Sequence, residues 1–174
     1  MDLKKYILEV KDFPKPGVGF KDITPIVQDA EAFGFVVNEM AAWARVRTPD
    51  IIVGIESRGF LFGAALAREL KLGMTIIRKK GKLPRETVSI EAPNEYAVEH
   101  FEMHRDAVKP GQRVLIVDDL IATGSSSSSA IKLVRKLEGN VVGFAAVVAL
   151  GFLGGEANIG KACPDVDVLA LVRY

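Results

Sequence analysis

Short apolar runs rich in branched residues alternate along this chain with segments whose apolar residues recur at helical spacing. Runs of this kind are typical of strands that are buried on both faces of a parallel sheet. The runs that predict strands are 51–55, 74–77, 88–90, 114–117, 141–150 and 166–172. Strands that alternate with helices indicate an α/β fold, with an open sheet whose central strands are parallel and joined by right-handed crossovers.

Helical spacing is clearest in residues 29–45, where the apolar residues recur every three or four positions. The complete set of helices predicted from the sequence is 3–10, 29–45, 60–70 and 128–137. Residues 13–17 hold two prolines and a glycine, which rule out regular structure and favour a fixed loop.

Composition limits the number of domains and the class of partner. A chain of 174 residues that is 49% hydrophobic fits one compact domain, so we expect a single domain over residues 1–174. The formal net charge of +1 indicates neither a nucleic-acid nor a membrane partner. The single cysteine, Cys163, excludes an intramolecular disulfide. Because the first residues are charged and no long apolar stretch follows, we expect a cytoplasmic protein.

The most informative chemistry lies in residues 114–126. Asp118 and Asp119 follow a buried run, at the end of a strand where open α/β sheets bind their ligands. The small residues that come next lead into a helix, so backbone N–H groups and the positive end of the helix dipole can hold a phosphate. Two carboxylates beside that phosphate suit sugar hydroxyls or a bridging Mg²⁺. A ribose 5-phosphate fits both features together, although either alone could be a capped turn or helix.

This stretch resembles the phosphoribosyl pyrophosphate motif of the type I phosphoribosyltransferases, in which apolar residues precede two acids and a Thr-Gly loop. A Walker loop competes poorly, because no Gly-Lys-Ser or Gly-Lys-Thr follows. Other segments are similar to the adenine branch of that family over nearly the whole chain. The resemblance implies an open, mostly parallel sheet flanked by helices, a small N-terminal hood to which residues 1–28 contribute, and a homodimer.

The resemblance also implies roles for the acid pair and the loop. Asp118 and Asp119 would hold the ribose hydroxyls. The residues that would anchor the 5-phosphate are Ala122, Thr123, Gly124, Ser125 and Ser126. Ser125 and Ser126 stand where the family usually has Gly-Thr, so Ser125 must tolerate the local backbone geometry or change it.

Residues 13–25 resemble the family's base-binding hood. There the backbone groups of Gly19 and Lys21 would meet the purine edge, while Phe20 would stack on the base. Backbone groups on a proline-stiffened loop can discriminate a 6-amino from a 6-oxo purine. Gly19 is smaller than the family's usual branched residue, so the hood would fit less tightly. Taken without the resemblance, Phe20 could be an ordinary core aromatic.

Two cationic segments resemble the parts of the family that meet pyrophosphate. They are residues 53–60, a strand followed by a glycine-flanked basic turn, and residues 78–84. The residues implied to contact pyrophosphate are Ser57, Arg58, Lys79 and Lys82. Without the resemblance, Arg58 could equally be a solvated surface charge, and the cationic run is usually a solvated face.

Residues 85–98 are polar and poorly periodic, as expected of a mobile lid. Glu95 and Tyr96 match the family's Glu-Tyr pair, and the resemblance makes Glu95 the candidate for handling the purine ring proton. Leu150 would pack on the base. Ala149 stands where many members have Glu, which removes any acid role from that position.

The implied activity is purine salvage, in which the 5-phosphoribosyl group passes from phosphoribosyl pyrophosphate to adenine and gives AMP and pyrophosphate. Magnesium would be the cofactor, bound mainly through pyrophosphate and ribose oxygens and not by a direct protein site. One alternative is a phosphoribosyltransferase for hypoxanthine, guanine or xanthine, which the hood argues against. A second is a regulatory protein that senses phosphoribosyl pyrophosphate and binds DNA. Neither a DNA-reading module nor a basic net charge supports it.

Overall fold

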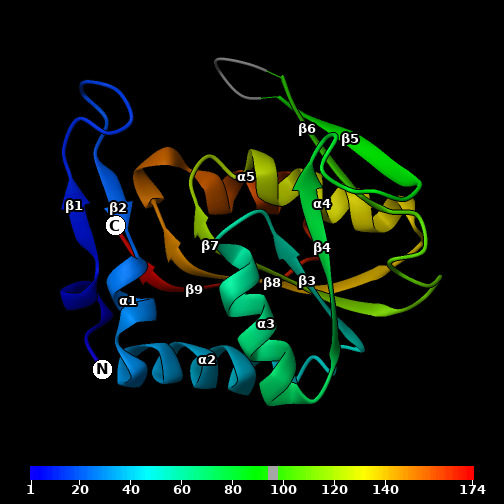
Figure 1. Cartoon of the computed structure of the whole chain (residues 1–174), viewed down its shortest axis with the longest axis horizontal. Coiled ribbons are helices and arrows are strands. Elements are labelled where there is room, and N and C mark those ends of the chain that lie inside the picture. Colours follow the sequence, from blue (N-terminus) through cyan, green and yellow to red (C-terminus); the bar gives the residue numbers. More distant parts are fainter. Residues whose placement is uncertain (94–97) are drawn as a thin grey trace.

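The computed structural model describes residues 1–93 and 98–174. This part of the chain forms a seven-stranded sheet in the order β5-β6-β4-β3-β7-β8-β9, with a separate two-stranded hairpin, β1–β2, at one side (Figure 1). The strands are β1 (Leu8–Val10), β2 (Phe20–Asp22), β3 (Ile51–Ile55), β4 (Gly73–Lys79), β5 (Thr87–Pro93), β6 (Val98–His104), β7 (Arg113–Ile121), β8 (Asn140–Ala149) and β9 (Val168–Arg173).

The centre of the main sheet is parallel. Strands β4, β3, β7, β8 and β9 pair in parallel with their neighbours, whereas β5 and β6 form an antiparallel hairpin that joins the sheet at the β4 edge. The predicted open, mostly parallel sheet is confirmed. Because the carboxyl ends of parallel strands meet at one edge, residues that end β3, β4 and β7 are brought together there.

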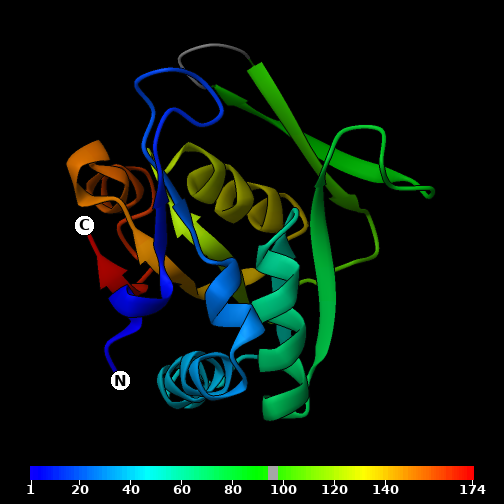
Figure 2. The same ribbon diagram turned by 60° about the vertical axis from the view of Figure 1, so that its left-hand side comes forward.

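Helices cover both faces of this sheet, with α2 and α3 on one face and α4 and α5 on the other (Figures 1 and 2). The helices are η1 (Leu3–Tyr6), α1 (Thr24–Gln28), α2 (Ala30–Arg45), α3 (Gly59–Leu70), α4 (Ser125–Lys136), η2 (Gly151–Leu153) and α5 (Gly155–Ala162). Among the helices of residues 1–93 and 98–174, none combines the length and apolar character needed to cross a membrane.

Strand β7 belongs to both layers of the core. Its residues alternate between the faces of the sheet, so Leu115 and Val117 join the cluster around α2 and α3, while Val114 and Ile116 join the cluster beneath α4. All four side chains are fully buried. The first half of β7 is therefore packed on both faces. The acid pair lies in its second half, toward the edge of the sheet where the parallel strands have their carboxyl ends.

The predicted helix over residues 3–10 is wrong. Only the single turn η1 forms, and the chain then extends as β1, which pairs with β2 through Leu8↔Asp22 and Val10↔Phe20. Pairing with a distant segment overrides the local helical spacing. This small hairpin stands apart from the main sheet (Figure 2).

Three further differences concern the second half of the chain. Strand β5 contains the predicted strand 88–90 but runs over residues 87–93, within the region also expected to be an irregular lid, and it pairs along the whole of β6, which the sequence did not predict. Helix α4 begins at Ser125, three residues earlier than expected, because the preceding Gly124 makes the turn with φ 80°. Helix α5 was also missed, since its glycines and polar residues weaken the helical pattern.

Candidate active site

A cavity of about 360 Å³ opens at the edge of the sheet where β3, β4 and β7 end. The residues that line it are Glu56, Ser57, Arg58, Lys79, Lys82 and Asp119. They come from the loop between β3 and α3, from the end of β4 and the turn after it, and from β7. The fold thus brings the two predicted pyrophosphate segments and one acid of the pair into a single cavity. Glu56 was not predicted.

Arg58 contacts Asp119 of the acid pair and lies near Phe20 of the β1–β2 hairpin. Its Nε donates a hydrogen bond to Asp119 Oδ2 at 2.5 Å, and its Cζ lies 5.3 Å from the centre of the Phe20 ring. The Asp119 side chain is only 9% exposed. Arg58 is therefore not an isolated surface charge. Its guanidinium lies between Phe20 of the β1–β2 hairpin and Asp119 of β7.

Asp118 and Asp119 lie within β7, which continues to Ile121, and not beyond its end as the apolar run had indicated. Both are buried, and the backbone N–H of Asp119 donates to Asp118 Oδ1 at 2.9 Å. Burial, followed by the neighbouring Asp119 charge, raises the pKa of Asp118 well above its usual range. At Gly59, the first residue of α3, a Cβ would lie 2.9 Å from Asp118 Oδ1, so a glycine is needed for this close approach.

The predicted phosphate loop turns at Gly124 and enters α4, whose first turn contains Ser125 and Ser126. Because the positive φ falls on Gly124, Ser125 has ordinary helical geometry and does not need a glycine's freedom. The N-cap residue, Gly124, has no side chain with which to cap this helix start. The first N–H groups of a helix have no partner within the helix, and the predicted phosphate site would use these groups.

Helix α5 braces the same loop. Asn158 Nδ2 donates to the carbonyl oxygen of Thr123 at 3.0 Å, and a Cβ added to Gly155 would lie 2.2 Å from the carbonyl oxygen of Ala122. Close backbone contact of this kind needs a glycine. The sequence signal was Gly154-Gly155 after the last central strand, which predicts a turn but not its partner.

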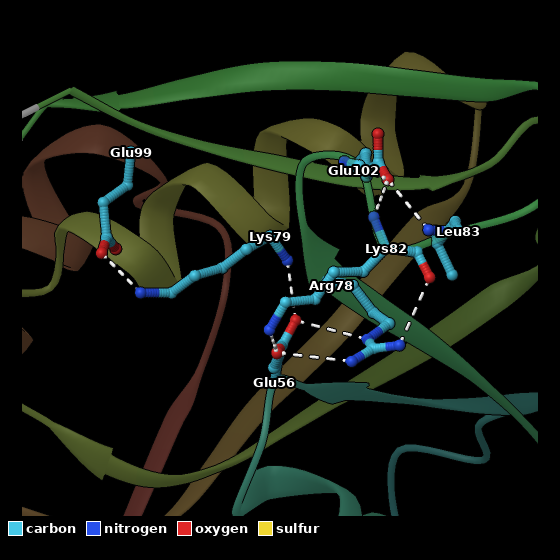
Figure 3. A network of polar contacts seen from close by, with 8 residues as sticks. Glu56, Arg78, Lys79, Lys82, Leu83, Glu99 and Glu102 are labelled. Carbon is cyan, nitrogen blue, oxygen red and sulfur yellow. Dashed lines mark hydrogen bonds and ion pairs between the residues drawn. The ribbon is translucent and has the colours of Figure 1, made fainter.

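Glu56 is the centre of a polar network at the floor of the cavity (Figure 3). Its Oε2 accepts the backbone N–H of Lys79 at 2.8 Å and Arg78 Nε at 3.3 Å, while its Oε1 pairs with Lys82 Nζ. Burial alone would raise the pKa of Glu56, but the hydrogen bonds from Lys82, Lys79 and Arg78 outweigh it and lower the pKa from 4.5 to about 2. Glu56 is thus an ionised counter-charge. An acid placed directly after a buried strand was the signal that could have revealed it.

A second buried carboxylate shapes the turn after β4. Glu102 Oε1 accepts the backbone N–H groups of Gly81, Lys82 and Leu83 at 3.0, 3.3 and 3.2 Å, as Figure 3 shows in part. Thr87 Oγ1 donates to the other oxygen at 3.3 Å. One acid on β6 therefore fixes the backbone that presents Lys82 to the cavity.

Phe20 and Lys21 point to opposite sides of β2, as successive strand residues do. The Phe20 ring meets Phe13 edge to face at 5.1 Å and is half-buried, so Phe20 is not an ordinary core residue. Lys21 Nζ instead pairs with Glu9 Oε2 at 3.0 Å and lies 4.3 Å from the Tyr174 ring. Only Phe20 faces Arg58.

Gly19 and Leu150 are the other two residues predicted to meet the base. A Cβ added to Gly19 would lie 3.3 Å from Glu9 Oε1, which is the end of an exposed side chain that can shift by the small amount needed. Leu150 follows β8 and is buried, and its backbone N–H donates to the carbonyl oxygen of Ile121 at 2.9 Å. Leu150 and the end of β7 are therefore neighbours at the same edge of the sheet.

Comparison with known proteins agrees with this geometry. Residues 25–161 match the model of the phosphoribosyl transferase domain, which is well over half of the chain. The chain belongs to the phosphoribosyltransferase family. The expected family and fold are thereby confirmed, and the cavity lies within the matched region.

Solved structures of phosphoribosyltransferases superpose on nearly the whole chain. The adenine phosphoribosyltransferase of Thermoanaerobacter pseudethanolicus is 44% identical, with a TM-score of 0.93 and coverage of 99% of this chain and 98% of that one. The enzyme of Rhodothermus marinus is 40% identical, with a TM-score of 0.93 and coverage of 99% and 96%. The enzyme of Saccharomyces cerevisiae is 36% identical, with a TM-score of 0.87 and coverage of 98% and 96%.

Two residues predicted from the phosphoribosyltransferase resemblance, Glu95 and Tyr96, lie outside the described residues. Their roles stay predictions. The strands that flank them in sequence, β5 and β6, pair over their full described length from Thr87↔His104 to Pro93↔Val98.

Proposed function

We propose that this phosphoribosyltransferase transfers the 5-phosphoribosyl group of phosphoribosyl pyrophosphate to adenine, which yields AMP and pyrophosphate. The observation that carries the proposal is the position of Arg58, in contact with Asp119 of the acid pair and 5.3 Å from the Phe20 ring. A donor held at the acid pair and a base held at Phe20 would then meet beside one cation. The adenine phosphoribosyltransferases that share 36–44% of this sequence support adenine as the base.

The cavity suits the pyrophosphate leaving group. Arg58, Lys79 and Lys82 would stabilise the negative charge that develops as the bond from the anomeric carbon to the pyrophosphate oxygen breaks. The backbone of Ser57 would add donors at the same place. Because the network of Glu56 and Glu102 already fixes the turn after β4, Lys82 is positioned before the substrate arrives.

The ribose and its 5-phosphate would lie along the end of β7 and the start of α4. Asp118 and Asp119 would hold the ribose hydroxyls while positive charge builds on the sugar, and residues 122–126 would bind the phosphate. A ring nitrogen of the purine then forms the new bond to the anomeric carbon and loses its proton, for which Glu95 is our candidate acceptor.

Magnesium fits this site as a partner of the donor. Among residues 1–93 and 98–174, no group of three or more His, Cys, Asp or Glu side chains is arranged to hold a metal ion. We therefore propose that pyrophosphate and ribose oxygens supply most of its ligands, with Asp118 and Asp119 nearby to orient the hydroxyls. The ion would neutralise charge on the departing pyrophosphate.

Base recognition would use the hood. Phe20 would stack on the purine, and the backbone groups of Gly19 and Lys21 would meet its edge. Leu150 would pack on the base from the end of β8. The solved yeast relative was crystallised with adenine, and a Giardia lamblia relative at 29% identity with 9-deazaadenine. The hood of residues 1–28, the homodimer and the cytoplasmic location stay predictions.

The direct test is to incubate the protein with Mg²⁺, phosphoribosyl pyrophosphate and one purine at a time, and to identify the nucleotide formed. We expect AMP from adenine and little product from hypoxanthine, guanine or xanthine. The Asp118→Asn/Asp119→Asn double variant, which removes charge with little change in shape, should lose most turnover but keep its circular dichroism spectrum. IMP, GMP or XMP as the main product would overturn the choice of base, and full activity in the double variant would overturn the ribose assignment.

A further inference from the structure

Each cation that lines the cavity already faces a carboxylate of this chain. Arg58 pairs with Asp119. Figure 3 shows the other two pairs, in which Lys82 meets Glu56 and Lys79 Nζ lies 2.7 Å from Glu99 Oε1. Each of these three lining cations therefore has a carboxylate partner already, and Glu56 is shared between Lys82 and Arg78. A pyrophosphate that binds here must therefore compete with groups of the protein itself.

The three carboxylates differ in how firmly they are held. Glu56 is 8% exposed and accepts hydrogen bonds from two side chains and one backbone N–H, and Asp119 is 9% exposed. To move either one would strand a buried charge. Glu99 is 33% exposed and its partner Lys79 is 51% exposed, so this pair can separate with both groups still in water.

The Lys79–Glu99 contact also lies where the backbone pairing between two strands ends. Among the residues that the structure describes, β6 pairs with β4 through Arg78↔Glu102 and Lys79↔Phe101, and Lys80 N–H donates one further hydrogen bond to the carbonyl oxygen of His100. Glu99 is the next residue of β6 in the same direction. Its side chain thus extends the connection between β6 and β4 beyond the end of the backbone ladder.

We propose that Glu99 acts as an internal competitor for the leaving group: it occupies Lys79 in the free enzyme and gives it up when pyrophosphate, alone or as part of the donor, enters the cavity. This inference rests on the proposed function. Glu99 is a positioning residue that acts through Lys79 and does not itself contact substrate. Its presence lowers the affinity for pyrophosphate, because part of the new contact replaces one already made.

The test is calorimetric titration of inorganic pyrophosphate, with Mg²⁺, into wild type and the Glu99→Gln variant. An exposed pair contributes up to about 1 kcal/mol, so Glu99→Gln should bind pyrophosphate about two- to fivefold more tightly. The matched control is Glu91→Gln, which removes the same charge from β5, at a position that pairs with His100 but does not line the cavity. This control should leave the affinity within error of wild type.

A salt series adds a measurement that a purely structural role would not affect. Because an exposed ion pair is screened by salt, the affinity difference between wild type and Glu99→Gln should shrink as ionic strength rises from about 0.05 to 0.5 M. If the Gln variant folds poorly, Glu99→Thr removes the carboxylate and keeps a residue suited to a strand.

The outcomes separate the two proposals. Wild type that does not bind pyrophosphate at all would contradict the proposed function. Normal binding by wild type with no gain in Glu99→Gln, or an equal gain in Glu91→Gln, would overturn the role of Glu99 alone.

Discussion

Arg58 Nε and Asp119 Oδ2 lie 2.5 Å apart, although the two residues are 61 positions apart in the chain. The pair connects the loop after β3 to the strand that carries both acids. Asp119 is nearly buried, so this hydrogen bond compensates a charge that would otherwise be costly.

The Arg58→Ala variant should therefore bind pyrophosphate much more weakly. Loss of one charge-assisted contact costs about 1.5 to 3 kcal/mol, which is roughly a 10- to 150-fold increase in Kd. Adenine binding should fall less, because Arg58 reaches only the face of the Phe20 ring. Calorimetry with each ligand measures both, and Arg45→Ala, which breaks the exposed pair with Glu69, is the control. Equal losses for the two ligands would count against the assignment.

Asp118 should make stability depend on pH in an unusual direction. Its pKa is raised on folding above the ordinary 3.8, so the folded state binds the proton more tightly than the unfolded state. The stabilisation from that proton is present at low pH and is lost as pH rises through the raised pKa. Asp118→Asn removes the titrating group but keeps an oxygen for the N–H of Asp119.

We therefore expect Asp118→Asn to raise the Tm at pH 7.5 by a few degrees and to raise it less at pH 4.5, while activity falls. Thermal unfolding at both pH values checks this. A variant that is less stable than wild type at pH 7.5 would show that the Asp118 charge stabilises the free protein.

Two glycines of α5 make a matched pair of substitutions. Gly155→Ala would place a Cβ 2.2 Å from the carbonyl oxygen of Ala122, whereas at Gly160 nothing lies within 4 Å. Gly155→Ala should cost about 1 to 3 kcal/mol of unfolding free energy and raise the KM for phosphoribosyl pyrophosphate, because the loop must shift. Gly160→Ala should stabilise by about 0.5 to 1 kcal/mol. Urea unfolding and steady-state kinetics measure both, and similar behaviour of the two variants would contradict the role of the loop contact.

Phe20 and Lys21 should respond differently to substitution, because only Phe20 faces Arg58. Phe20→Ala should lose about 1 to 3 kcal/mol of base stacking, so kcat/KM for adenine should fall roughly 10- to 100-fold. Lys21→Ala keeps the backbone carbonyl and amide, and should leave the adenine preference intact even if the lost contacts with Glu9 and Tyr174 change the overall rate. The ratio of kcat/KM for adenine to that for hypoxanthine is the quantity to measure. A collapsed ratio in Lys21→Ala, or unchanged adenine use in Phe20→Ala, would place the base elsewhere.

The central strands could be predicted because burial on both faces leaves a clear apolar pattern. Strand β3 has the bounds that its sequence run indicates, and the run at 114–117 marks the core of β7. Strands that lie in hairpins were harder to predict from the sequence. All three residues of β1 are exposed, and the strand forms through pairing with β2, so its own residues carry little strand signal.

The site could be predicted only where a residue belongs to a recognisable motif. Arg58 and Asp119 were candidates from the sequence, but their contact was not predicted, since it depends on how the loop after β3 meets strand β7. Glu56, Glu99 and Gly155 were missed for the same reason, because their importance comes from partners far away in the chain.

Strand β7 and the β1–β2 hairpin lie on two sides of the proposed site, and their amide groups should exchange with solvent on different time scales. The amides of β7 lie between two buried clusters, so they should exchange with solvent deuterium only when the whole sheet unfolds. The β1–β2 hairpin has three residue pairs and an exposed first strand, and two-stranded hairpins of that size are only marginally stable. Its amides should exchange through frequent local opening. The hairpin that is proposed to bind the base can thus open locally while the acid pair stays in place, so this half of the proposed site could adapt to its ligand without disturbing the other half.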